Sequence, residues 1–159
     1  MAIITLQFVG SGGPINWIIK TRTNSGISHV DVVLANEDLL GSQLHEKDGD
    51  GVRIREPNYK KFDKIIRVNL QVTDEQYNKF WEFLLQQVGK PYDLMAIIGL
   101  TAHRNWRETD SWFCSELVSA ALEYAGIFTI RTLINWVDPQ TLLLLVCVCS
   151  SFLKYEEIL

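Results

Sequence analysis

The sequence predicts a single α+β domain with a mainly antiparallel sheet. The expected strands come first along the chain and the long helices follow, an order that favours separate strand and helix layers. No linker or repeat divides residues 1–159, and a chain of that length can bury one sizeable core. Hydrophobic residues make up 47% of the chain and charged residues 21%, which excludes a disordered protein.

β-branched and apolar runs bounded by turn residues indicate five strands. They are expected at residues 1–9, 28–34, 39–44, 51–55 and 64–70. After the first strand, the glycine-rich turn at 10–14 leads into a short helix at 16–20. Trp17 and Ile18 of this helix are expected to pack inward.

The clearest helix begins after Thr73, which together with Gln76 fits a capping box. Its apolar residues recur at the spacing of one helical face, and Gly89 is expected to end it. These apolar residues are Tyr77, Phe80, Trp81, Leu84, Leu85 and Val88.

Two further helices are expected towards the end of the chain. One begins near Cys114, with Asp110 or Ser111 as its cap, and stops at Gly126. The other starts at 138–139 and runs into the apolar stretch 142–149, which we interpret as a buried strand or the end of a core helix. Eight residues are too few to span a bilayer.

The charge balance and the N-terminal residues bear on partners and location. The formal net charge of −4 argues against a general nucleic-acid binder, which normally carries a basic field. The first residues lack the basic region of a secretory signal, so we expect a cytoplasmic protein without a membrane anchor, and a phage-encoded origin is one speculation. The oligomeric state is left open.

Cys114 is the first candidate for chemistry, because it lies at the start of its expected helix. Unpaired backbone N–H groups at a helix N-terminus favour a thiolate and could bind an oxyanion. The alternative is a buried structural cysteine. Cys147 and Cys149 lie inside an apolar run and are interpreted as core residues. No metal or cofactor is expected, since neither a Cys-x-x-Cys, a His-x-x-x-His nor a phosphate-binding loop occurs.

His29 is the leading candidate for the base that a nucleophilic cysteine needs. It opens an expected strand, and alternation along the strand places Asp31 on the same face. The alternative is a core histidine with no catalytic role. His45 and His103 lie in polar surroundings and are interpreted as surface residues.

Several segments together resemble the permuted papain-like hydrolases, the circularly permuted branch of the NlpC/P60 superfamily that includes the YiiX/YaeF type. The segments 28–34 (SHVDVVL) and 112–118 (WFCSELV) resemble its paired histidine and cysteine signatures. The segment 89–93 (GKPYD) is similar to its Gly-x-Pro-Tyr-Asp element, and 51–53 and 138–139 match weaker elements. The likeness runs from residue 29 to about 140 and implies a circularly permuted papain-like fold, in which an antiparallel sheet or barrel packs against helices.

The resemblance implies roles for individual residues. Cys114 is expected to attack a carbonyl, His29 to act as the base, and Tyr92 to line the pocket or to be a core tyrosine. The family's third catalytic position falls near 41–43, where Ser42 or Gln43 could accept the imidazole N–H. His45 is a more distant option. Asp31 could orient His29 or bind a cationic group of the substrate.

Glu116 and four arginines are further charged residues near the predicted motifs. Glu116 follows Cys114 by two positions, which on a helix points it away from the thiol and favours a structural role in the first turn. Four arginines could form an anion-attracting rim or an ordinary solvated surface: Arg53, Arg55, Arg104 and Arg107.

The expected function is that of a thiol hydrolase, an amidase or peptidase acting through an acyl-enzyme on a small peptide or amide substrate, as in cell-wall peptides. One alternative is a lipid acyl hydrolase or acyltransferase of the lecithin:retinol acyltransferase type. Another is a catalytically silent binding module on the same fold.

Overall fold

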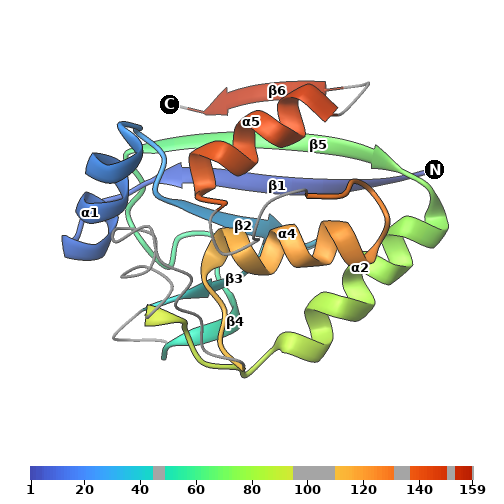
Figure 1. The fold of residues 1–159 in the computed structure, drawn as a ribbon, viewed down its shortest axis with the longest axis horizontal. Helices are drawn as coiled ribbons and strands as arrows, with labels where there is room; N and C mark the ends of the chain where they lie inside the picture. The colour runs from blue at the N-terminus through green and yellow to red at the C-terminus, as the bar shows by residue number, and fades with distance from the viewer. Residues whose placement is uncertain (45–48, 95–109, 131–136, 150–152, 159) are drawn as a thin grey trace.

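The computed structural model describes residues 1–44, 49–94, 110–130, 137–149 and 153–158 (Figure 1). The strands are β1 (Ala2–Gly10), β2 (His29–Val33), β3 (Leu39–Gln43), β4 (Gly51–Arg55), β5 (Lys64–Val72) and β6 (Leu153–Ile158). The helices are α1 (Pro14–Thr23), α2 (Asp74–Gln87), α4 (Cys114–Tyr124) and α5 (Pro139–Cys149). His45, His103, Arg104 and Arg107 lie outside the described residues.

The six strands form one sheet in the order β4-β3-β2-β1-β5-β6 (Figure 1). Every neighbouring pair is antiparallel, which confirms the predicted antiparallel sheet. The five predicted strands are all present. The sixth, β6, was not predicted, and it pairs with β5 along the edge of the sheet.

One face of this sheet forms the core, because side chains alternate along each strand. The residues Ile4, Leu6 and Phe8 of β1 are opposite Leu70, Val68 and Ile66 of β5, and all six are buried. Helices α2, α4 and α5 place their apolar residues in the same cluster, so they cover one face of the sheet (Figure 1).

The first helix corrects the prediction that Trp17 and Ile18 pack inward. The Trp17 side chain is 67% exposed and that of Ile18 is also on the surface, whereas Ile19 is buried. Asn16 shares the inward face of α1 with Ile19, three residues away, and its amide donates to the backbone oxygen of Gly12 at 2.8 Å. The inward face of α1 is therefore offset from the one that was predicted.

The predicted capping box of α2 is confirmed, since Thr73 and Gln76 each accept from the other's backbone N–H at 3.1 Å. Leu85 and Val88, which were expected on the apolar face, are exposed.

The start of α4 differs from the prediction that Asp110 or Ser111 caps it. The N-cap residue is Phe113, and its N–H donates to the buried carboxylate of Glu116 at 3.3 Å. Glu116 thus has the structural role in the first turn that was predicted for it.

The apolar stretch near the C-terminus is part of a helix, as one of the two interpretations expected. The Asp138 carboxylate caps α5 by accepting from the N–H groups of Gln140 and Thr141, both at 2.9 Å. Cys147 packs against the core cluster. Among the described residues, no helix combines the length and the apolar character that crossing a bilayer requires.

Candidate active site

The strand β2 places His29 and Asp31 on one side and Val30 and Val32 on the other, where the valines enter the core. β2 pairs with β3 only at Val32 and Val33. The ladder between these two strands therefore does not extend to Asp31 or His29.

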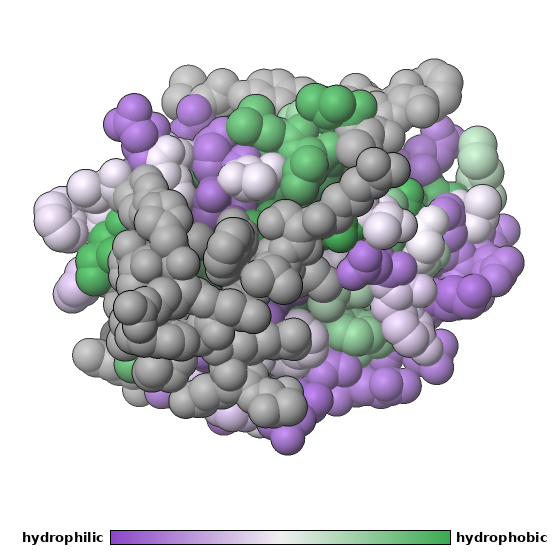
Figure 2. Space-filling view, viewed as in Figure 1, coloured by the Kyte–Doolittle hydropathy of each residue, from purple (hydrophilic) through white to green (hydrophobic). Residues whose placement is uncertain are grey.

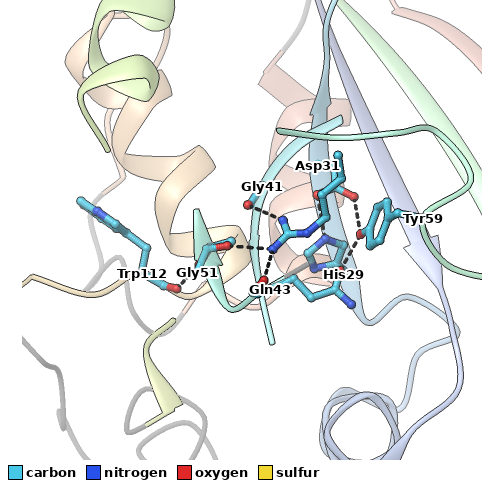
Figure 3. A network of polar contacts seen from close by, with 10 residues as sticks. His29, Asp31, Gly41, Gln43, Gly51, Tyr59 and Trp112 are labelled. Carbon is cyan, nitrogen blue, oxygen red and sulfur yellow. Dashed lines mark hydrogen bonds and ion pairs between the residues drawn. The ribbon is translucent and has the colours of Figure 1, made fainter. Parts of the chain in front are cut away.

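His29 and Asp31 contact each other directly, and both are buried (Figure 3). The His29 Nε2 atom lies 2.8 Å from Oδ1 of Asp31. Because Nε2 is engaged in this way, Nδ1 is the ring nitrogen left to meet another group. The contact fixes which way the imidazole faces.

Charges on both sides act on the pKa of His29. Burial by itself lowers this pKa, but the negative charge of Asp31, followed by that of Cys114, outweighs burial. Hydrogen bonds to both side chains act in the same direction, and together they raise the pKa of His29 from 6.5 to about 10. The imidazole is therefore protonated at neutral pH, between a carboxylate and a thiol.

Cys114 is the first residue of α4, and its side chain is only 1% exposed. Two backbone hydrogen bonds hold the segment before it. Trp112 donates its N–H to Pro91 at 3.0 Å, and Asp93 donates its N–H to the Trp112 carbonyl at 3.1 Å. These bonds connect the 89–93 segment to the start of the cysteine helix.

The same segment is joined to the sheet through β4. The Val52 N–H donates to the Lys90 carbonyl at 2.9 Å, and the Gly89 N–H donates to the Val52 carbonyl at 2.8 Å. Gly51 has a φ of 91°, and a Cβ there would lie 2.1 Å from the Lys90 carbonyl oxygen, so only glycine allows this approach. Three of the motifs singled out in the sequence thus meet beside Cys114.

Ser42 does not occupy the third position that was predicted for it. Its hydroxyl donates to the Trp112 carbonyl at 2.5 Å, and the residue that contacts His29 is Asp31 instead. The physical reason is that side chains alternate between the two faces of a strand. Ser42 lies on the same face of β3 as the core residue Leu40, away from Asp31. Ser42 therefore ties the segment before Cys114 to β3.

Gly41 makes room for the Asp31 carboxylate. A Cβ at Gly41 would lie 2.0 Å from Oδ1 of Asp31, far inside any ordinary contact. A glycine within a strand often marks the close approach of another group, and that signal was present in the sequence.

Tyr59 was not found by reasoning on the sequence, because no motif surrounds it. Its hydroxyl lies 3.1 Å from Oδ2 of Asp31 and within hydrogen-bonding distance of the Gln43 amide (Figure 3). Gln43, the other predicted third residue, is thus one contact further from His29.

Arg55 is buried, which corrects its assignment to an exposed rim, whereas Arg53 is exposed as expected. The Arg55 guanidinium donates to the carbonyl oxygens of Gly41, Gly49 and Gly51 at 3.0 to 3.2 Å. It also lies 5.6 Å from the centre of the Tyr59 ring.

Tyr92 lies close enough to Cys114 for the charge of the thiol to act on its hydroxyl. Burial raises the pKa of Tyr92 well above its usual value, and the charge of Cys114 adds to this effect. Its ring meets that of Phe113 edge-on, with 6.2 Å between the centres.

The structure therefore brings Cys114, His29, Asp31 and Tyr92 together. In the parts of the chain that it describes, no group of three or more histidine, cysteine or acidic side chains is arranged to hold a metal ion.

Three comparisons relate the chain to known proteins. No protein-family model matches the chain. No curated protein matches it either. Among solved structures, the chain resembles the crystal structure of the metalloprotein YiiX from Escherichia coli O157:H7, with a TM-score of 0.53 and 19% sequence identity. The match covers 76% of this chain and 64% of that chain, so this chain spans less than two thirds of its neighbour. At this identity the likeness concerns the fold, and the chain has a YiiX-like α+β fold.

Proposed function

We propose that this protein is a thiol hydrolase of the permuted papain-like (NlpC/P60) type, which cleaves an amide bond through an acyl-enzyme. The observation that carries the proposal is the His29 imidazole held between the Asp31 carboxylate and the Cys114 thiol. A protonated imidazole beside a thiol favours the thiolate, which is the reactive form of cysteine. The start of a helix adds a partial positive charge at the same place.

In the first step, the Cys114 thiolate forms a bond to the carbonyl carbon of the substrate. The carbon–nitrogen bond then breaks, and the leaving amine takes the proton from Nδ1 of His29. In the second step, a water molecule gives a proton back to Nδ1 and attacks the thioester carbon. The carbon–sulfur bond breaks, which releases the acid and restores the thiolate–imidazolium pair.

Asp31 is the residue that orients His29 in this proposal. Its contact with Nε2 turns Nδ1 towards the thiol and stabilises the imidazolium. Backbone N–H groups in the first turn of α4, including that of Cys114, supply donors for the oxyanion. Tyr92 forms part of the wall beside the acyl group.

The neighbouring protein is described as a metalloprotein. His29 and Asp31 direct Nε2 and Oδ1 at each other, and the described residues offer no group of three metal-ligating side chains. The proposed steps therefore use only the side chains of this chain.

The test is turnover of a panel of aminoacyl amides, short peptides and p-nitrophenyl esters by the wild-type protein and by Cys114→Ala. We expect Cys114→Ala to abolish hydrolysis, and mass spectrometry after rapid acid quenching to find the acyl group on Cys114. Cys147→Ala is the matched control, because Cys147 is also a free thiol but lies on α5. Equal turnover by the wild type and Cys114→Ala would overturn the proposal and favour the silent module.

One observation favours a second candidate, a lipid acyl hydrolase. Figure 2 shows apolar residues gathered over α5, where Leu144 is 56% and Val148 is 83% exposed. An exposed apolar patch can meet a lipid surface. Flotation with phosphatidylcholine vesicles separates the candidates: a lipid hydrolase should float with them and lose this binding in Val148→Glu, whereas a peptide amidase should stay at the bottom of the gradient.

A further inference from the structure

The segment between β4 and β5 places Tyr59 behind the carboxylate of the proposed active site. Burial raises the pKa of Tyr59, and the negative charge of Asp31 raises it further. The hydroxyl therefore remains a hydrogen-bond donor throughout the pH range in which enzymes work. It has one proton and lies near two acceptors, the Asp31 carboxylate and the Gln43 amide.

The charged acceptor binds this proton more strongly, because hydrogen bonds to ionised groups are about twice as strong as neutral ones. A hydroxyl that donates to Asp31 can still accept a hydrogen bond, and the Gln43 amide can turn its NH₂ group towards it. The resulting chain runs from Gln43 through Tyr59 and Asp31 to His29 (Figure 3).

The two oxygens of Asp31 then have different partners. Oδ1 lies 2.8 Å from His29, and Oδ2 lies 3.1 Å from the Tyr59 hydroxyl. A carboxylate held at both oxygens cannot rotate about its Cβ–Cγ bond without breaking one contact. A carboxylate held only by His29 could rotate, and the imidazole would follow it.

The Tyr59 ring is itself held in place. The buried Arg55 guanidinium lies 5.6 Å from its centre and is anchored to three backbone carbonyl groups of β3, β4 and the loop between them. Phe62 packs against the ring edge-on, with 5.6 Å between the centres. Arg55 and Phe62 thus fix the position of the ring, and with it the position of the hydroxyl.

We propose that Tyr59 is a positioning residue, whose hydroxyl holds Asp31 so that Nδ1 of His29 faces Cys114. This inference rests on the proposed function. It predicts that Tyr59 affects the rate of the chemical steps and not the binding of substrate, because Asp31 and His29 separate it from the thiol.

The experiment is the hydrolysis of p-nitrophenyl acetate by Tyr59→Phe, which removes only the hydroxyl and keeps the ring. We expect kcat to fall roughly ten- to hundredfold with KM unchanged within about twofold. Tyr59→His, which keeps a ring with a donor, should recover part of the loss. Tyr77→Phe is the matched control, since Tyr77 is also half-buried but lies on α2, and its kcat should equal that of the wild type.

A double-mutant cycle with Asp31→Ala tests whether Tyr59 acts through Asp31. In the Asp31→Ala background, Tyr59→Phe should change kcat by less than about twofold. A thermal unfolding scan identifies any variant that has lost its fold, and the Tyr59→His comparison replaces Tyr59→Phe in that case.

Two results would overturn the positioning role while leaving the proposed function intact: an unchanged kcat in Tyr59→Phe, or the full loss still present in the Asp31→Ala background. If Cys114→Ala retains full turnover, the proposed function itself is wrong, so the two failures are distinguishable.

Discussion

Substituting Gly41 by alanine should separate His29 from Asp31 without altering either residue. The new Cβ would lie 2.0 Å from Oδ1 of Asp31, 3.1 Å from its Cγ and 3.4 Å from the Val30 carbonyl oxygen. Since carbon and oxygen atoms do not approach within about 3 Å, Oδ1 must move by about 1 Å or more. A movement of that size breaks the 2.8 Å contact with Nε2.

The pKa of His29 gives the magnitude of the effect. The folded-state value of about 10 lies above the ordinary 6.5, so protonation of His29 stabilises the fold. This stabilisation is complete below about pH 6.5 and is lost as the pH rises from there to about 10. At about 1.4 kcal/mol per pKa unit, the whole effect is on the order of 5 kcal/mol. Cys114 supplies a part that survives, so Gly41→Ala should lose roughly 2–3 kcal/mol at pH 6.

Urea unfolding at about pH 6 and about pH 10 measures this loss. Gly41→Ala should be destabilised at pH 6 by roughly 2–3 kcal/mol more than at pH 10, relative to the wild type. Gly26→Ala is the matched control: a Cβ there meets nothing within 4 Å, so its effect should not depend on pH. If the destabilisation of Gly41→Ala is the same at both pH values, the Asp31 contact does not raise the pKa of His29 and the reasoning is refuted.

Three further predictions follow from the same contacts. Alkylation of Cys114 by iodoacetamide at about pH 7 should be faster in the wild type than in His29→Ala, because a charged imidazole beside the thiol favours its reactive form; equal rates in the two proteins would argue against the ion pair. Ser42→Ala should lower the free energy of unfolding by roughly 1 kcal/mol in urea and reduce kcat by less than about threefold, because its hydroxyl binds the Trp112 carbonyl and not the imidazole. Gly51→Ala should lower the free energy of unfolding by roughly 2–3 kcal/mol, since its φ of 91° and a carbonyl 2.1 Å from the new Cβ both oppose a side chain; an unfolding midpoint equal to that of the wild type would contradict this.

Local patterns in the sequence were sufficient to predict most of the elements. Alternating and β-branched runs predicted five of the strands, and the Thr73–Gln76 capping box predicted where α2 begins. The prediction for Trp17 and Ile18 was wrong because a short helix with little amphipathic character does not specify which side faces the protein. β6 was missed because its polar residues are paired along an edge strand and do not alternate clearly with apolar ones.

The sequence by itself determined that a cysteine at a helix start and a histidine on a strand are the residues to examine, because both positions follow from local patterns. Only the tertiary structure decided the histidine's partner. Ser42 lies on β3 and Asp31 on β2. The alternation of side chains along each strand, and the end of the β2–β3 ladder at Val32, decide which of the two reaches the His29 ring. Tyr59 comes from a segment 28 residues away from Asp31. No local pattern encodes that contact, since the connection between β4 and β5 brings Tyr59 to β2 only in the folded chain.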